Sequence, residues 1–224
     1  MLNITSVFRS QLPSVLVAAG HGGTHWVNAA IYILLPYITL DLGLSYTQAG
    51  LVMTVFHFST FAANAFSGPL VDLRGNGKYS RFQAYSLLIG GIAMLLMSIS
   101  GSIYMLFLSV ALIGVCISLW HPAALTYLSL QYPGNRGFVL SVHSIGASIG
   151  DALSPLLAAF LLTYVTINGV NLTWNTTSAL LSIPLFVTML IILLFLKDKE
   201  NPNDNTKKSK DDNYFSNLKL LIKN

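Results

Sequence analysis

The chain has 224 residues, of which 54% are hydrophobic and only 9% charged, and its mean hydropathy is +0.65. Because soluble domains carry about 25% charged residues, this composition excludes a soluble globular protein and predicts an all-α membrane protein. The pI is about 9.2, but the basic residues are confined to short loops and a tail, so we expect no nucleic-acid partner. The single cysteine, Cys116, excludes an intrachain disulfide.

Apolar runs predict six transmembrane helices, each long enough to cross a bilayer. Their ranges are 14–40, 46–72, 82–100, 103–130, 137–165 and 177–197. Residues 1–13 are expected to form a cytoplasmic N-terminus, residues 14–197 the bundle, and residues 198–224 a cytoplasmic linker or tail. Within that tail, apolar residues from Tyr214 onward fall on one helical face, as in a surface helix or a packed linker helix.

The twelve Lys and Arg residues fix the predicted orientation. Arg9 precedes the first helix, Arg74, Lys78 and Arg81 follow the second, Arg136 follows the fourth, and the other seven follow the sixth. The three opposite connections contain none. The positive-inside rule therefore places both termini in the cytoplasm. We take the membrane to be an inner or plasma membrane.

The second and fifth helices resemble each other when they are shifted by 87 residues. The shift aligns Asn64 with Asp151 and Ser67 with Ser154, and the two helices cross the membrane in opposite directions. The pattern indicates two inverted three-helix repeats, the architecture of secondary transporters.

Polar residues at helical spacing form a stripe on three of the six helices. The stripes are His21, His25, Asn28 and Tyr32; His57, Thr60, Asn64 and Ser67; and Ser141, Ser144, Ser148 and Asp151. Polar faces in hydrocarbon must meet protein or water, so we expect these helices, with the fourth through His121, to surround a polar interior. The third and sixth helices would then be an outer, lipid-facing pair. The alternative is that the polar groups only bond neighbouring helices.

Asp151 is the most unusual residue of the chain. It follows Arg136 by 15 positions, which places it ~22 Å into the span, where an aspartate costs roughly 2.5–3.5 kcal/mol to insert. Such a group can carry a proton, bind a cation or hold a cationic substrate. The alternative is a neutral aspartate that bonds another helix, or one that reaches toward water outside. The residues expected to serve substrate binding or proton coupling are Asp151, His25, Asn28, His121, His21 and Asn64.

His21 and His25 are spaced by one helical turn, which suits two metal ligands. No cysteine or carboxylate near them in the sequence completes a set, so a cavity-lining role is favoured and no metal site is predicted. The sequence has no P-loop, nucleotide-binding glycine motif or Ser/His/Asp order, so we expect neither an enzyme, nor an ATP-driven pump, nor a cofactor.

The stretch "GPLVDLRGNGK" resembles the loop signature of the major facilitator superfamily. Gly68, Asp72 and Gly75 occupy matching positions, whereas Arg74 stands one place later than the usual basic residue and Lys78 follows. The resemblance implies a charge relay that controls closure, with Gly68 allowing two helices to approach. The alternative is a loop that only fixes orientation.

The fourth and fifth helices resemble the fosmidomycin-resistance-type branch of that superfamily. The matching residues are His121, Pro122, Arg136, Gly137, Gly146, Gly150 and Pro155. Gly146, Gly150 and Pro155 form a motif that would let the helix bend and pack closely. The fourth helix lacks the intramembrane arginine of the drug–proton antiporters, so a mechanism built on that arginine does not carry over.

The superfamily resemblance implies twelve helices in two halves, of which this chain has the first. Its partners would be a small-molecule substrate, protons, the bilayer, and either a missing C-terminal half or a second copy. We expect proton-coupled export of a small organic molecule by alternating access. The alternatives are uptake of a nutrient or organic anion, and a non-transporting half-protein that acts as a membrane scaffold.

Overall fold

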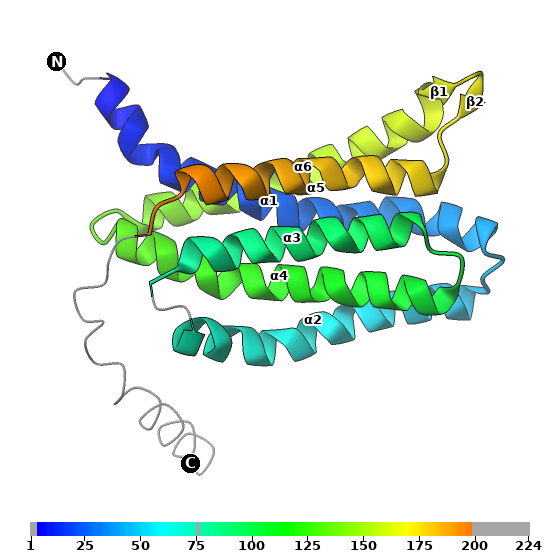
Figure 1. The fold of residues 1–224 in the computed structure, drawn as a ribbon, viewed down its shortest axis with the longest axis horizontal. Coiled ribbons are helices and arrows are strands. Elements are labelled where there is room, and N and C mark those ends of the chain that lie inside the picture. Colours follow the sequence, from blue (N-terminus) through cyan, green and yellow to red (C-terminus); the bar gives the residue numbers. More distant parts are fainter. Residues whose placement is uncertain (1–3, 75–76, 199–224) are drawn as a thin grey trace, which may run out of the picture.

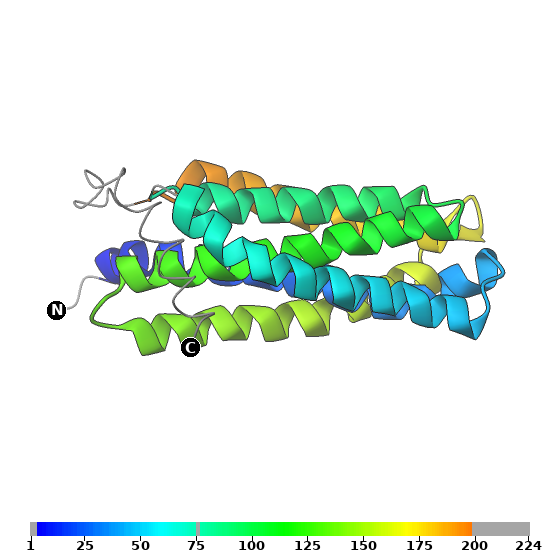
Figure 2. The ribbon, with the colours of Figure 1, turned by 90° about the horizontal axis from the view of Figure 1, so that it is seen from below.

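Six long helices form the described part of the protein, and they run lengthwise side by side (Figures 1 and 2). The computed structural model describes residues 4–74 and 77–198. The helices are α1 (Ile4–Asp41), α2 (Tyr46–Arg74), α3 (Tyr79–Ser98), α4 (Ile103–Gln131), α5 (Arg136–Tyr164) and α6 (Trp174–Phe195). A short hairpin of β1 (Thr166–Ile167) and β2 (Val170–Asn171) joins α5 to α6.

The helix ends lie within three residues of the predicted ranges, with one exception. Helix α1 begins at Ile4 and continues through Pro13, so it takes in most of the segment that we expected to precede the bundle. The hairpin was not predicted. Its turn is Asn168–Gly169, and both residues have positive φ angles of 53° and 77°, the conformation that suits a two-residue hairpin turn. The predicted tail from residue 199 onward lies outside the described residues.

Five of the described helices, α2 to α6, are long and apolar enough to cross a membrane. Helix α1 is long enough at 38 residues, but His21, His25 and Asn28 lower its hydropathy. A helix of this kind can cross only if its polar side chains face protein or water. The protein is a multi-pass membrane protein in which α1 is the most polar crossing helix.

The packing of the helices follows the inverted repeat. Helix α1 packs against α5 as α4 packs against α2, and α6 contacts α1 as α3 contacts α4. Exchanging the first three helices with the last three therefore preserves these principal contacts. This relation confirms the fold predicted from the alignment of the second and fifth helices.

The helices differ in how much surface they cover. Within the 18-residue apolar stretch that qualifies each helix as a membrane span, 56% of the residues are buried in α3, against 11% in α2 and 28% in α5. Helices α3 and α6 do pack against each other, but α3 also lies along α4. The expectation that the third and sixth helices are an outer, lipid-facing pair stays a prediction, and within this six-helix unit α2 is the least buried span.

Helices α1 and α5 touch through their backbones. A Cβ atom on Gly146 would overlap the carbonyl group of Ala18, and one on Gly150 would overlap that of Gly22. The Ser154 hydroxyl donates to the Trp26 carbonyl at 2.7 Å in the same contact. The glycines of the predicted bending motif thus serve close packing, and α5 remains helical through Pro155 to Tyr164.

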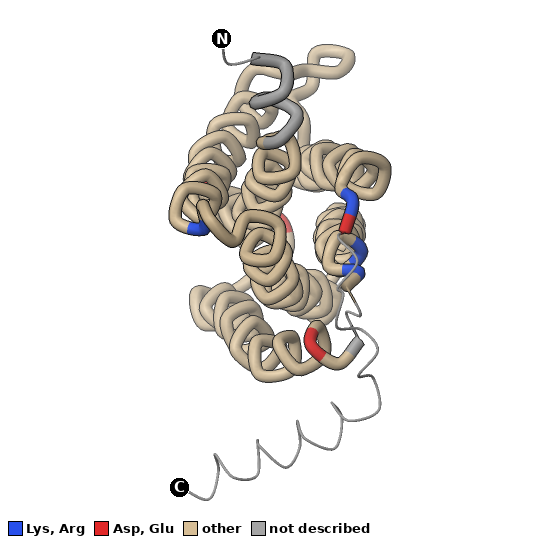
Figure 3. Tube along the Cα trace, turned by 90° about the vertical axis from the view of Figure 1, so that its left-hand side faces the viewer, with Lys and Arg blue, Asp and Glu red and all other residues tan. Residues whose placement is uncertain are grey.

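The described basic residues gather at one end of the bundle (Figure 3). At that end Asp198 accepts hydrogen bonds from the backbone N–H (2.9 Å) and the hydroxyl (2.6 Å) of Ser80. A carboxylate at this position caps the first turn of α3 and complements its helix dipole. The Tyr127 hydroxyl donates to the Lys197 carbonyl at 3.0 Å, so the chain leaving α6 is fixed to both α3 and α4.

The backbone contact between α1 and α5 predicts a stability difference between two glycines. Gly150→Ala should destabilise the bundle by about 1–3 kcal/mol, the usual cost of an overpacked contact. Gly50→Ala is the matched control, because a Cβ at Gly50 meets no atom within 4 Å. Thermal unfolding in detergent measures both, and equal melting temperatures would contradict the close contact.

Candidate functional site

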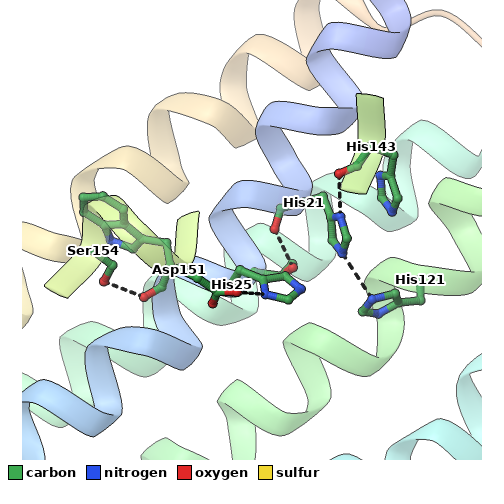
Figure 4. A network of polar contacts seen from close by, with 8 residues as sticks. His21, His25, His121, His143, Asp151 and Ser154 are labelled. Atoms are coloured by element: carbon green, nitrogen blue, oxygen red, sulfur yellow. Dashed lines mark hydrogen bonds and ion pairs between the residues drawn. The ribbon is translucent and has the colours of Figure 1, made fainter. Parts of the chain in front are cut away.

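A polar cluster occupies the middle of the bundle where α1, α4 and α5 meet (Figure 4). His25 of α1 and Asp151 of α5 form an ion pair, with 2.9 Å between Nδ1 and Oδ2. Their side chains are 28% and 49% exposed, so the pair is open on one side. Asp151 is the only Asp or Glu between Asp72 and Asp198 in the sequence, and its partner is one of the residues that the stripe on α1 predicted.

His21 and His121 extend the cluster from α1 to α4. Their Nε2 atoms are 3.3 Å apart. The Nδ1 atom of His21 is 2.8 Å from the carbonyl oxygen of His143, and that of His121 is 2.8 Å from the carbonyl oxygen of Ile117. The structure thus brings together four of the six residues predicted for binding or coupling: His21, His25, His121 and Asp151.

His143 belongs to this cluster although the sequence analysis did not select it. Its ring stacks on the ring of His21, with 3.7 Å between centroids and an angle of 3° between planes. The side chain is 3% exposed. Neither of its ring nitrogens has a hydrogen-bond partner among the described residues. The sequence analysis passed over His143 because it lies off the serine stripe of α5. The signal that could have found it is its residue type, since the chain has only five histidines.

Asn28 and Asn64 do not join the cluster in the described structure. Asn28 is partly exposed on α1, beyond His25. Asn64 is exposed on α2, where its backbone carbonyl accepts a hydrogen bond from Ser67. The position that the repeat aligns with Asp151 therefore has no matching partner on the other side of the bundle.

The remaining polar stripes lie on an exposed face next to the cluster, which we call the polar face. Its further members are Tyr32, His57, Ser141, Ser144 and Ser148, all of them exposed. The Tyr32 hydroxyl and Nε2 of His57 are 3.4 Å apart and link α1 to α2. Ser141 and Ser144 donate to the carbonyls of Gly137 and Leu140 in their own helix. Polar residues of α1, α2, α4 and α5 are thus connected, as the stripes predicted.

A groove of about 410 Å³ runs between α1, α5 and α6, and it is apolar. Gly22, Gly146 and Gly150 form part of its wall, together with Ile145 and Ile149. None of the polar stripe residues lines it. The groove and the polar face are therefore separate surfaces of the bundle.

The predicted gating loop is only partly described. Asp72 and Lys78 are exposed at the charged end of the bundle, whereas the side chain of Arg74 and all of Gly75 lie outside the described residues. A Cβ at Gly68 would meet no atom within 4 Å. Among the described residues no helix approaches Gly68, and its role in close helix approach stays a prediction.

Three of the clustered histidines have ring nitrogens suited to a common ligand. One ring nitrogen from each of His21, His25 and His121 lies within 4.8 Å of the others. A third ligand could not be expected from local spacing, because His121 follows His25 by 96 positions. Helix packing supplies it.

The sequence profile of the Major Facilitator Superfamily matches residues 17–224. The chain belongs to that superfamily. It is 25% identical over 171 residues to the fosmidomycin resistance protein of Escherichia coli (strain K12), a match that covers 75% of this chain and 40% of the relative. It is also 30% identical over 141 residues to a probable hexose phosphate transport protein of Chlamydia pneumoniae, covering 62% of this chain and 30% of that protein.

Solved transporter structures share the fold of this superfamily member. The tetrameric PepTSo2 superimposes with a TM-score of 0.70 at 18% identity, over 86% of this chain and 41% of that one. The peptide transporter POT superimposes with a TM-score of 0.67 at 20% identity, over 94% of this chain and 44% of that one. The chain therefore has a transporter fold and spans less than half the length of the relatives it matches.

The polar face of this superfamily member predicts a difference in accessibility between neighbouring residues of α5. In a Cys116→Ala background, Ser148→Cys in a bilayer should react with a hydrophilic maleimide, because Ser148 lies on the polar face. Ile149→Cys is the matched control, because Ile149 lines the apolar groove. Labelling is measured by mass shift, and labelling of Ser148→Cys that is no greater than that of Ile149→Cys would contradict a distinct, water-accessible polar face.

Proposed function

We propose that the chain is the N-terminal half of a secondary active transporter that exports a small organic molecule in exchange for protons. The observation that carries the proposal is the His25–Asp151 pair. It joins α1 to α5 in the middle of two membrane-crossing helices, and it is open to the polar face. A charged residue at such a depth is costly and marks a transport pathway more often than a structural contact.

The proton is the coupling ion that this pair fits best. Histidine and aspartate both accept and release protons, and chains of such residues form proton relays in pumps and transporters. No nucleotide-binding motif is present in the sequence, so an ion gradient is the energy source that we assign. His21 and His121 extend the relay from α1 to α4, and Asn28 and Asn64 are proposed to contact substrate from α1 and α2.

The direction of transport is proposed from the relatives. The name of the fosmidomycin resistance protein favours export of an organic molecule. The hexose phosphate transport protein and the ribitol transporter of Klebsiella pneumoniae favour the alternative, uptake of a nutrient. A non-transporting scaffold is the remaining alternative, and it leaves the costly pair in the membrane without a role.

A second six-helix bundle is proposed to cover the polar face. Helix α2 is the least buried span of this unit, and α5 exposes its polar stripe. In secondary transporters the substrate lies near the midplane between two such bundles, which rock against each other. The second bundle is proposed to be either a C-terminal half or another copy of this chain, with both termini in the cytoplasm.

The coupling role predicts the behaviour of an Asp151 variant. In cells that express the chain within its complete reading frame, Asp151→Asn should abolish the pH-gradient-driven component of flux and leave expression unchanged. The pair is half-exposed, and such pairs contribute only about 0–1 kcal/mol to stability, so the variant should fold. Asp41→Asn is the control, because Asp41 accepts from Trp174 at the far end of the bundle.

Two probes report the direction of flux in this experiment. Export predicts that expression raises the fosmidomycin concentration needed to stop growth, and uptake predicts greater accumulation of labelled glucose 6-phosphate. If Asp151→Asn transports either probe with unchanged pH dependence, the aspartate has no coupling role. If the wild-type chain moves neither probe, nor any proton in response to added substrates, the scaffold alternative is favoured.

The loop after α2 is proposed to act in gating. Asp72 is exposed at the end of α2, where a carboxylate can pair with a basic group of the loop such as Arg74 or Lys78 as the bundles close. Asp72→Asn should therefore slow substrate flux several-fold without changing substrate affinity, as measured by binding to the purified protein. A change in affinity with an unchanged maximal rate would place Asp72 in binding instead of gating.

A further inference from the structure

We propose that His21, His25 and His121 form a binding site for one divalent transition-metal ion of the Zn²⁺ type. The site lies within the bundle between α1 and α4, beside Asp151 of α5 (Figure 4). This assignment goes beyond transport and does not rest on the proposed function. It depends on which ring nitrogens have free lone pairs, on their separation, and on how the rings are held.

The hydrogen bonds fix the tautomers of His21 and His121. A backbone carbonyl oxygen can only accept a hydrogen bond. Because Nδ1 of His21 is 2.8 Å from the His143 carbonyl, and Nδ1 of His121 is 2.8 Å from the Ile117 carbonyl, both Nδ1 atoms must carry a hydrogen. In the neutral rings, both Nε2 atoms are then acceptors with a free lone pair.

These two lone pairs face each other across 3.3 Å. Two acceptors at this distance repel unless a cation lies between them, either a proton on one ring or a metal ion bound by both. Zn–N bonds of about 2.0–2.1 Å in tetrahedral geometry place two ligand nitrogens about 3.3–3.4 Å apart. The observed separation is therefore the one that two imidazole ligands of a single zinc ion adopt.

His25 supplies the third imidazole. Its Nδ1 atom is bonded to the Asp151 carboxylate at 2.9 Å, which leaves its Nε2 atom free. One ring nitrogen of each of the three histidines already lies within 4.8 Å of the others, so all three rings are gathered where one ion can reach them. A proton joins two nitrogens at most, whereas a transition-metal ion uses all three.

The surroundings of the three rings are those of a metal site. Metal-binding histidines usually donate their other N–H to a carbonyl or carboxylate, which fixes the ring and strengthens the ligand. Each of the three rings here has such a partner at Nδ1: the His143 carbonyl, the Ile117 carbonyl and Asp151. His143 also stacks on His21 and limits its rotation.

The charge around the site favours a divalent cation. No Lys or Arg occurs between residues 10 and 73, between 82 and 135, or between 137 and 196, so the crossing segments of all six helices lack positive side chains apart from histidine. Asp151 contributes a negative charge beside His25. The 28% exposure of His25 leaves room for a fourth ligand, such as water.

Co²⁺ is the probe for this site, because it replaces Zn²⁺ in nitrogen sites and absorbs visible light. The full chain, purified in detergent with an affinity tag that lacks histidine, should bind one Co²⁺ per chain. Tetrahedral d–d bands should appear on titration and disappear when Zn²⁺ is added. Elemental analysis after dialysis checks the stoichiometry independently of the spectrum.

Three variants separate the roles of the residues. His121→Gln removes a ligand and should eliminate the tetrahedral bands. Asp151→Asn keeps all three ligands and should weaken Co²⁺ affinity about 10–100-fold, as expected for a partner that orients a ligand. His57→Gln is the matched control, because His57 is an exposed histidine outside the cluster that contacts Tyr32, and it should bind Co²⁺ as the wild type does.

The outcome does not depend on transport. Wild-type protein that binds no Co²⁺ or Zn²⁺ after dialysis overturns the metal site, and so does equal binding by the wild type and His121→Gln. If His121→Gln fails to elute as a folded species, His25→Gln replaces it with the same expectation. Loss of metal binding with intact pH-driven flux would reject this site and keep the proposed function, and the reverse result would do the opposite.

Discussion

The structure depends on one constraint, which is that a polar group within hydrocarbon must find its partner inside the protein. Hydroxyls meet this constraint by donating to carbonyls of neighbouring helices, as Ser154 does to Trp26, Ser118 to Thr60 and Ser86 to Cys116. Histidine and aspartate side chains cannot be satisfied so simply. Helix α1 carries two histidines, and it therefore lies where α4 and α5 can both reach them.

Glycine residues allow α1 to lie this close to α5. Gly146 and Gly150 allow the α5 backbone to approach Ala18 and Gly22 of α1, so the side chains flanking the contact are brought within hydrogen-bonding distance. His25 meets Asp151 on one side, and His21 meets the carbonyl of His143 on the other. The small residues thus serve the polar cluster indirectly, because a larger residue at either glycine would separate the helices that carry it.

The sequence predicted the helices well, but it predicted poorly which side chains of different helices meet. Apolar runs and the positions of Lys and Arg mark the helices, because crossing a bilayer imposes length and hydropathy on each helix separately. The 3.6-residue period likewise placed His21 and His25 on one face. The contact of His21 with His121 and the stacking of His143 depend on how separate helices pack, which no local pattern encodes.

The two repeats pack their helices in the same way, but they differ in their ionisable side chains, and this difference marks the position of the site. The contact between α2 and α4 corresponds to that between α1 and α5, and in it Gly114 approaches Ser59 and Thr60 while Ser118 bonds a carbonyl. The bonds of that contact come from hydroxyls, and His57 of α2 lies apart from the cluster. Asp151 and four histidines lie close together where α1, α4 and α5 meet. Symmetry explains the packing of both sides and cannot explain the ionisable groups on one. Because those groups are costly in the membrane, their concentration where α1, α4 and α5 meet is the observation on which both the proposed proton coupling and the proposed metal site rest.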